Sequence, residues 1–160
     1  MNLSTLVPPG LVGPQGPSVS DGDKGDITVS ASGSTWTIDS PITGKSLTDP
    51  TIIGTILEDV YTISDGAAFE VDPGNGSIQL ITLGASRTPK ATNFAAGESV
   101  TMMIDDGSAY TITWTDSTWG TGGVTWVNGS APTLATSGYT VLQFWKVSTK
   151  VYGARVGDVA

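Results

Sequence analysis

Acidic side chains are the residues of this chain whose types and spacing could do chemistry. Asp105 and Asp106 stand together between two apolar strand patterns, and a pair of carboxylates can serve acid–base or glycosidase chemistry. Gly107 follows them, however, and Asp-Asp-Gly is a typical turn sequence. A further acid could complete a site, and the sequence does not choose among Glu58, Asp59, Glu70 and Glu98. We favour the turn and predict no catalytic residues and no enzyme.

Two other stretches begin or end like ligand-binding loops. Residues 21–26 (DGDKGD) start like a calcium loop. Such a loop needs Asp or Asn at its fifth position, Gly at its sixth and Glu at its twelfth, but Gly25, Asp26 and Ser32 stand there. Residues 44–46 (GKS) match the end of a P-loop, but Asp39 replaces its leading glycine. We interpret the first as a polar turn and predict neither a metal nor a cofactor.

The composition excludes several kinds of site and partner. The chain has no cysteine and no histidine, which rules out disulfides, thiol nucleophiles, Ser-His-Asp triads and imidazole metal ligands. The net charge is −8 and the seven basic residues are scattered, so a nucleic-acid partner is not expected. No apolar run reaches the roughly 18 residues that span a bilayer, and no signal peptide is recognisable. We therefore predict no membrane association and synthesis in a cytoplasm.

Aromatic residues are the side chains best suited to binding. They gather in the last third of the chain: Tyr110, Trp114, Trp119, Trp126, Tyr139, Trp145 and Tyr152. Such rings stack on sugars and fill interfaces, but they also fill small β cores. We predict a buried Trp145, because it stands beside Leu142 and Phe144. Trp119 lies between hydroxyl-rich and glycine-rich stretches, so Trp119 and Tyr139 are the candidates for receptor contact.

The elements that must position these residues are predicted to be strands. Glycine is abundant at 21 residues, and charged residues make up only 14% of the chain against about 25% in typical proteins. From residue 51 onward, alternating patterns separated by turn signals predict an all-β domain, an antiparallel β-sandwich or barrel of jelly-roll type. The predicted strands are 51–57, 59–64, 67–71, 77–83, 99–104, 109–114, 123–127, 140–147 and 150–156.

Residues 26–39 predict a β-hairpin ahead of that domain. Ile27 and Val29 alternate with polar residues, a turn follows at 32–34, and Trp36 and Ile38 alternate in the same way. An isolated hairpin is marginally stable in water, so this one needs a partner surface, such as another subunit.

The first twenty residues carry no charge and contain four prolines. Glycine recurs at every third position in residues 10–18, as in collagen, where three chains meet at an axis that only glycine fits. Three triplets cannot hold a triple helix alone, so we interpret this stretch as an extended arm, with a disordered N-terminus as the alternative. We predict docking through Leu3, Leu6, Val7, Leu11 and Val12. We predict threefold contact through Gly10, Gly13, Gly16, Ile27, Trp36 and Ile38.

The predicted organisation has three parts. A docking arm covers residues 1–20, a hairpin and linker cover 21–50, and a β-sandwich domain covers 51–160.

Two segments of the chain resemble bacteriophage virion structural proteins. Residues 21–39 (DGDKGDITVSASGSTWTID) resemble an element near the N-terminal parts of tail-fibre and other virion proteins. Residues 78–156 look like a β domain that recurs at the C-terminal ends of phage structural proteins. Three features carry this second resemblance. They are the hydroxyl-rich strand that ends at Trp114, the turn that runs from Trp126 through Ala131-Pro132-Thr133-Leu134, and the last pair of strands, around Phe144 and Tyr152-Gly153.

This resemblance implies a non-enzymatic virion protein made in the host cytoplasm. It implies a homotrimeric, fibre-like appendage whose arm docks on tail or baseplate proteins and whose β domain contacts a host surface glycan. The alternative is a capsid decoration protein, of cement or head-fibre type, bound to the major capsid protein. A glycan-binding or glycan-cleaving protein is the third and least favoured interpretation.

Overall fold

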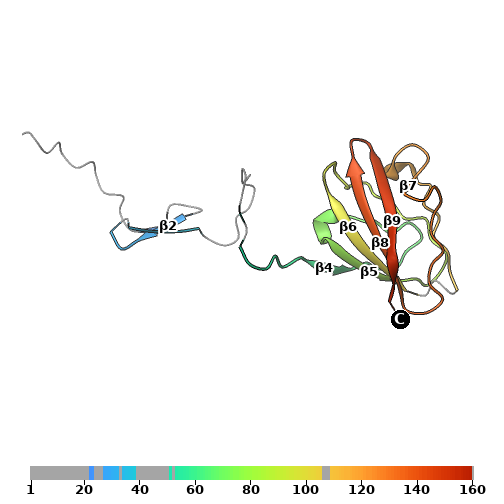
Figure 1. The fold of residues 1–160 in the computed structure, drawn as a ribbon, viewed down its shortest axis with the longest axis horizontal. Helices are drawn as coiled ribbons and strands as arrows, with labels where there is room; N and C mark the ends of the chain where they lie inside the picture. The colour runs from blue at the N-terminus through green and yellow to red at the C-terminus, as the bar shows by residue number, and fades with distance from the viewer. Residues whose placement is uncertain are drawn as a thin grey trace, which may run out of the picture. The chain divides into compact units, whose positions relative to one another are not determined.

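The computed structural model describes residues 22–23, 27–32, 34–38, 51, 53–105 and 109–159. The chain divides into two units, Met1–Ile53 (unit 1) and Gly54–Ala160 (unit 2), which are drawn in Figure 1. The described residues form strands and short 3-10 turns and no α-helix, so the all-β prediction is confirmed at the level of fold class. The predicted arm over 1–20 and the linker over 40–50 lie outside the described residues.

Unit 1 contains a small antiparallel sheet of three strands in the order β1-β2-β3. These are β1 (Gly22–Asp23), β2 (Ile27–Ser30) and β3 (Thr35–Ile38). The predicted hairpin is confirmed, because β2 pairs with β3 in the register Ile27 opposite Ile38 and Val29 opposite Trp36. Its turn places Ala31 and Ser32 at φ values of 51° and 55°, a left-handed backbone that non-glycine residues rarely adopt.

Unit 2 is built on one mixed sheet in the order β4-β5-β6-β8-β9-β7. Its strands are β4 (Val60–Thr62), β5 (Ile78–Thr82), β6 (Ser99–Asp105), β7 (Thr125–Trp126), β8 (Tyr139–Val147) and β9 (Lys150–Val159). The pairs β4–β5, β5–β6 and β7–β9 are parallel, whereas β6–β8 and β8–β9 are antiparallel. The connections over 63–77 and 83–98 cross over and bring the next strand back in the same direction.

An irregular layer of loops covers one face of this sheet. Residues 67–71, 85–90 and 111–113 lie side by side, joined by the parallel bridges Glu70–Lys90 and Arg87–Ile112. The predicted strands at 67–71 and 109–114 belong to this layer and form single bridges only. The predicted antiparallel sandwich or barrel is therefore wrong for the described residues, because parallel crossovers build the sheet and bridged loops replace a second one.

The core lies between the sheet and this layer of loops. The sheet contributes alternate residues of its central strands, such as Met102 and Phe144, as the two-residue period of a strand requires. The loops contribute Phe69, Phe94 and Trp114. Figure 1 shows β5, β6, β8 and β9 side by side in unit 2. Of the aromatic residues considered for binding, Trp114 and Trp119 belong to the core, and Tyr110 and Trp126 pack against it.

Two acidic side chains hold the covering loops in place. Asp116 caps the 3-10 turn η3 (Ser117–Trp119), accepting from the backbone N–H of Thr118 at 2.9 Å and from its hydroxyl at 2.7 Å. These bonds lower the pKa of Asp116. Asp65 accepts from Arg87 Nε at 2.7 Å and from Gly84 N–H at 3.1 Å, and the hydrogen bond from Arg87 lowers its pKa.

Candidate functional site

The hairpin residues predicted for threefold contact share one face of the unit 1 sheet. Ile27 pairs with Ile38 and Val29 pairs with Trp36, and directly paired residues project to the same side of a sheet. Val29 is buried, but Trp36 is 57% exposed and Ile38 is 59% exposed. We call Ile27, Trp36 and Ile38 the hairpin face. The other predicted contact and docking residues lie outside the described residues: Leu3, Leu6, Val7, Gly10, Leu11, Val12, Gly13 and Gly16.

A second set of exposed apolar residues leads into β4. Ile56, Leu57 and Val60 are exposed, and Leu57 has 93% of its surface in solvent. We call these three residues the β4 approach. The predicted strand over 51–57 does not form in its described part. Extended chain with large apolar side chains in water is a candidate contact surface.

Trp119 is not a surface residue, so the prediction that it contacts a receptor is wrong. It has 0% exposure, and its indole nitrogen donates to the Pro89 carbonyl oxygen at 2.8 Å. Its ring also lies 5.5 Å from that of Trp114 and 5.2 Å from that of Phe144, measured between centroids. The η3 turn, capped by Asp116, directs the indole into the core.

The two other aromatic predictions have different outcomes. Tyr139 is half-buried at the start of β8, opposite Val159, and its receptor contact stays a prediction. Trp145 was predicted to be buried, but it is only half-buried and stacks on Tyr152 with a centroid distance of 6.1 Å. Trp145 alternates with the buried Phe144, so it projects from the sheet face opposite the core.

Three of the carboxylates considered for acid–base chemistry accept structural hydrogen bonds. Glu58 accepts from the Ser77 hydroxyl at 2.7 Å, Glu98 accepts from Ala95 N–H at 2.7 Å, and Glu70 accepts from the backbone and hydroxyl of Thr92. Asp106 lies outside the described residues. In the part of the chain that the structure describes, no three acidic groups gather in a way that could hold a metal ion.

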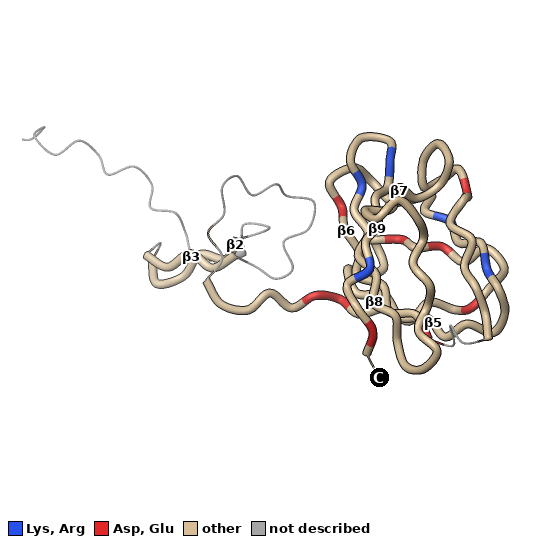
Figure 2. The backbone as a smooth tube through the Cα atoms, turned by 45° about the vertical axis from the view of Figure 1, so that its right-hand side comes forward, with Lys and Arg blue, Asp and Glu red and all other residues tan. Residues whose placement is uncertain are grey.

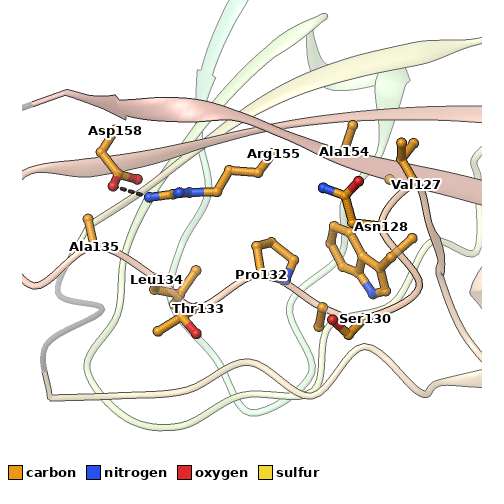
Figure 3. Close-up of a pocket in the computed structure, with 13 residues that line it drawn as sticks. Val127, Asn128, Ser130, Pro132, Thr133, Leu134, Ala135, Ala154, Arg155 and Asp158 are labelled. Atoms are coloured by element: carbon orange, nitrogen blue, oxygen red, sulfur yellow. Dashed lines mark hydrogen bonds and ion pairs between the residues drawn. The ribbon is translucent and has the colours of Figure 1, made fainter.

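A cleft of about 480 Å³ opens between β9 and the segment that follows β7. Figure 3 shows Arg155 and Asp158 on one wall, with Pro132, Thr133 and Leu134 on the facing segment. The remaining lining residues are Trp126, Val127, Asn128, Ser130, Ala131, Ala135, Gly153 and Ala154. Pocket volumes of about 300–1,000 Å³ are typical of small-molecule sites, so this cleft is a candidate binding site.

A β-bulge places Arg155 and Asp158 on the same wall. Leu142 pairs with Arg155 and Thr140 pairs with Asp158, although these partners are two residues apart on β8 and three apart on β9. The additional residue in β9 reverses its alternation, so both charged side chains project toward the face that carries the buried Leu142 and Thr140. They form an ion pair there, which Figure 3 marks with a dashed line.

Glycine at position 153 allows Trp126 to pack against the strand. A Cβ atom at Gly153 would lie 2.8 Å from the nearest ring atom of Trp126, so any larger residue would displace the indole. Trp126 makes edge-type contacts with Trp114 and Phe144, at centroid distances of 5.6 Å and 5.7 Å. Its half-buried ring, which lines the cleft, is therefore held in place.

Sequence reasoning missed the polar residues of this cleft. The resemblance drew attention to Trp126 and to the turn over 131–134, but not to Asn128, Arg155 or Asp158. One signal was available, because Gly157 interrupts a strand pattern, and glycine inside a strand often marks a bulge. The loop that faces the bulge could not be identified from that signal.

Charged residues form no basic stripe in the described part of the chain. Figure 2 shows Lys and Arg on separate segments of unit 2, interspersed with Asp and Glu. No helix of the described residues has the length and apolar character needed to cross a membrane. Comparison of the chain with protein-family models, with curated proteins and with solved structures finds no match in any of the three.

Proposed function

We propose that this chain is a non-enzymatic structural subunit of a bacteriophage virion that assembles as a homotrimeric, fibre-like appendage. The resemblance of residues 21–39 and 78–156 to virion proteins supports the class. The observation that carries the assembly is the exposure of large apolar side chains on the hairpin face and on the β4 approach. The outward display of unit 2 toward the host surface is part of the same proposal.

Energetic reasoning favours a partner for these surfaces. Burial of a large apolar side chain contributes about 1.5–3 kcal/mol, and association costs about 4–15 kcal/mol. Trp36, Ile38 and Leu57 from each of several copies supply a gain on the scale of that cost. The strands of the unit 1 sheet have only two to four residues, shorter than typical strands, so association would also stabilise this sheet. We infer that the partner is another copy of the chain, since glycine at every third position over 10–18 fits threefold contact.

Light scattering of the purified full chain tests the assembly. We expect a particle of three times 16.4 kDa at micromolar concentration, and a monomer would contradict the proposal. The double variant Trp36→Ser/Ile38→Ser should dissociate, whereas Val147→Ser, which alters an exposed valine at the end of β8, should not. Leu57→Ser should also weaken the trimer and lies outside the hairpin, so a misfolded hairpin cannot explain its effect.

Deletion of residues 1–20 tests anchoring to other virion proteins. We expect particles that lack this protein, while the near-ultraviolet circular dichroism of unit 2 is retained. Normal incorporation of the truncated chain would contradict docking by the arm. Imaging of a label fused to the C-terminus then separates a tail appendage from capsid decoration, which is the second candidate.

A further inference from the structure

We propose that the cleft beside β9 binds a neutral saccharide ring. The proposal concerns unit 2 alone and does not depend on the oligomeric state or on a place in a virion. It is carried by the charge balance of the cleft, by polar side chains without partners, and by apolar residues placed beside them.

Charge balance in the cleft favours a neutral ligand over an ion. Arg155 and Asp158 are the charged residues among those that line it, and they pair with each other. A phosphate or carboxylate bound to Arg155 would lie beside the like charge of Asp158, and an amine bound to Asp158 would lie beside the like charge of Arg155. A neutral ligand can instead accept from the guanidinium and donate to the carboxylate while the pair stays intact.

Three exposed polar side chains also line the cleft, and the described part of the chain gives them no hydrogen-bond partner: Asn128, Ser130 and Thr133. Figure 3 shows Asn128 and Ser130 near one end of the cleft and Arg155 reaching toward the other. An amide, two hydroxyls, a guanidinium and a carboxylate offer both donors and acceptors. A polyhydroxylated ligand, whose every hydroxyl both donates and accepts, matches such a mixed set.

Apolar residues complete the match to a sugar ring. Trp126 lines the cleft, and Pro132 and Leu134 lie on the segment that faces β9. Sugar rings carry C–H groups beside their hydroxyls, and a fixed indole offers a large apolar surface for them at little entropic cost. An open-chain polyol lacks a rigid face of this kind, so the cleft should distinguish a ring from glycerol.

The edge of β9 contributes backbone groups to the same wall. β7 pairs with β9 only at Tyr152 and Gly153, and Val127 N–H donates to the Gly153 carbonyl oxygen at 3.0 Å. Beyond Gly153, no described residue continues this ladder on that edge of β9. Unpaired strand-edge groups are donors and acceptors for a ligand.

Ligand-observed NMR on the full chain tests the proposal. The probes are methyl glucoside, methyl galactoside and N-acetylglucosamine, with glycerol and inorganic phosphate at the same concentration for comparison. We expect saturation transfer to at least one saccharide and none to glycerol or phosphate. Asn128→Ala should weaken that binding about tenfold through loss of a polar contact, while Asn75→Ala, an exposed asparagine outside the cleft, should leave it unchanged.

A second variant gives effects of opposite sign. Asp158→Asn should weaken saccharide binding and should create a response to phosphate, because Arg155 loses its partner. The proposal is overturned if no saccharide binds at tens of millimolar, or if phosphate binds the unaltered protein as well as a saccharide does. It is also overturned if Asn128→Ala and Asp158→Asn both leave saccharide binding unchanged. Binding of an extended proline-rich peptide without any saccharide response would assign the β9 edge to peptide recognition and would overturn it too.

Discussion

Trp36 in unit 1 and Trp119 in unit 2 both stand among serine, threonine and glycine residues, yet 57% of Trp36 is exposed and none of Trp119 is. Trp36 belongs to a three-stranded sheet in which Val29 is the buried apolar residue among those described. Trp119 belongs to a loop that closes over a six-stranded sheet. The difference teaches that alternation makes a strand, whereas burial needs a second layer. Unit 2 supplies that layer from its own loops, and we propose that unit 1 obtains it from other copies.

Replacing each tryptophan with alanine should give the largest difference in the free energy of unfolding of unit 2. Trp119→Ala should lower the free energy of unfolding of unit 2 by about 3–5 kcal/mol, because a cavity forms and the bond to Pro89 is lost. Trp36→Ala should change it by less than about 0.5 kcal/mol. Urea denaturation followed by near-ultraviolet circular dichroism measures both, and similar losses would contradict the difference in burial between the two tryptophans.

Two neighbouring glycines test how closely the loops of unit 2 must approach one another. Gly123 and Gly122 have φ values of 83° and 82°, but a Cβ atom at Gly123 would lie 2.0 Å from the Trp114 carbonyl oxygen, and one at Gly122 would meet nothing within 4 Å. Gly122→Ala should therefore cost only the left-handed backbone, about 1–2 kcal/mol. Gly123→Ala should cost clearly more, as measured by thermal unfolding. Equal costs would mean that the loop layer relaxes freely.

The ion pair between Asp65 and Arg87 should make unit 2 sensitive to acid. The pKa of Asp65 is lowered in the folded state, so its contribution to stability is present above the unfolded pKa of about 3.9 and is lost as the pH falls through the folded value. The effect should be smaller than those above, because water screens a pair near the surface. Urea midpoints between acidic and neutral pH should show a shallower dependence in Asp65→Asn and in Arg87→Gln. An unchanged pH profile in both variants would contradict this role.

The smallest expected change in the free energy of unfolding comes from glycine substitutions in one turn of each unit. Ser148, in the turn between β8 and β9, has a φ of 55°, and Ala31 in unit 1 has a φ of 51°. Glycine relieves a left-handed strain of about 1–2 kcal/mol but loses about 0.5–1 kcal/mol of backbone entropy. Ser148→Gly should thus raise the free energy of unfolding of unit 2 by about 0.5 kcal/mol, and Ala31→Gly should not change it. A stabilisation of unit 2 by Ala31→Gly would show that the two units fold together.

Local alternation of apolar and polar residues correctly predicted several of the strands that pair in the two sheets. The hairpin at 26–39 and the strands near 77–83, 99–104, 140–147 and 150–156 are confirmed to within a few residues. The segments 67–71 and 109–114 have equally good strand patterns but form only bridged loops. Alternation does not say which segments will pair, so it could not predict the parallel crossovers or the bridged loops that cover the six-stranded sheet.

The amino-acid sequence by itself determined the all-β class, the hairpin and the turn at Asn128-Gly129, because backbone preference and alternation act over a few residues. The absence of cysteine and histidine likewise limited the available chemistry at once. Only the tertiary structure decided that Trp119 is core and that Arg155, Asp158 and Trp126 line one cleft. Both outcomes depend on contacts between segments far apart in the chain, and one of them on a single extra residue in β9, which no local period encodes.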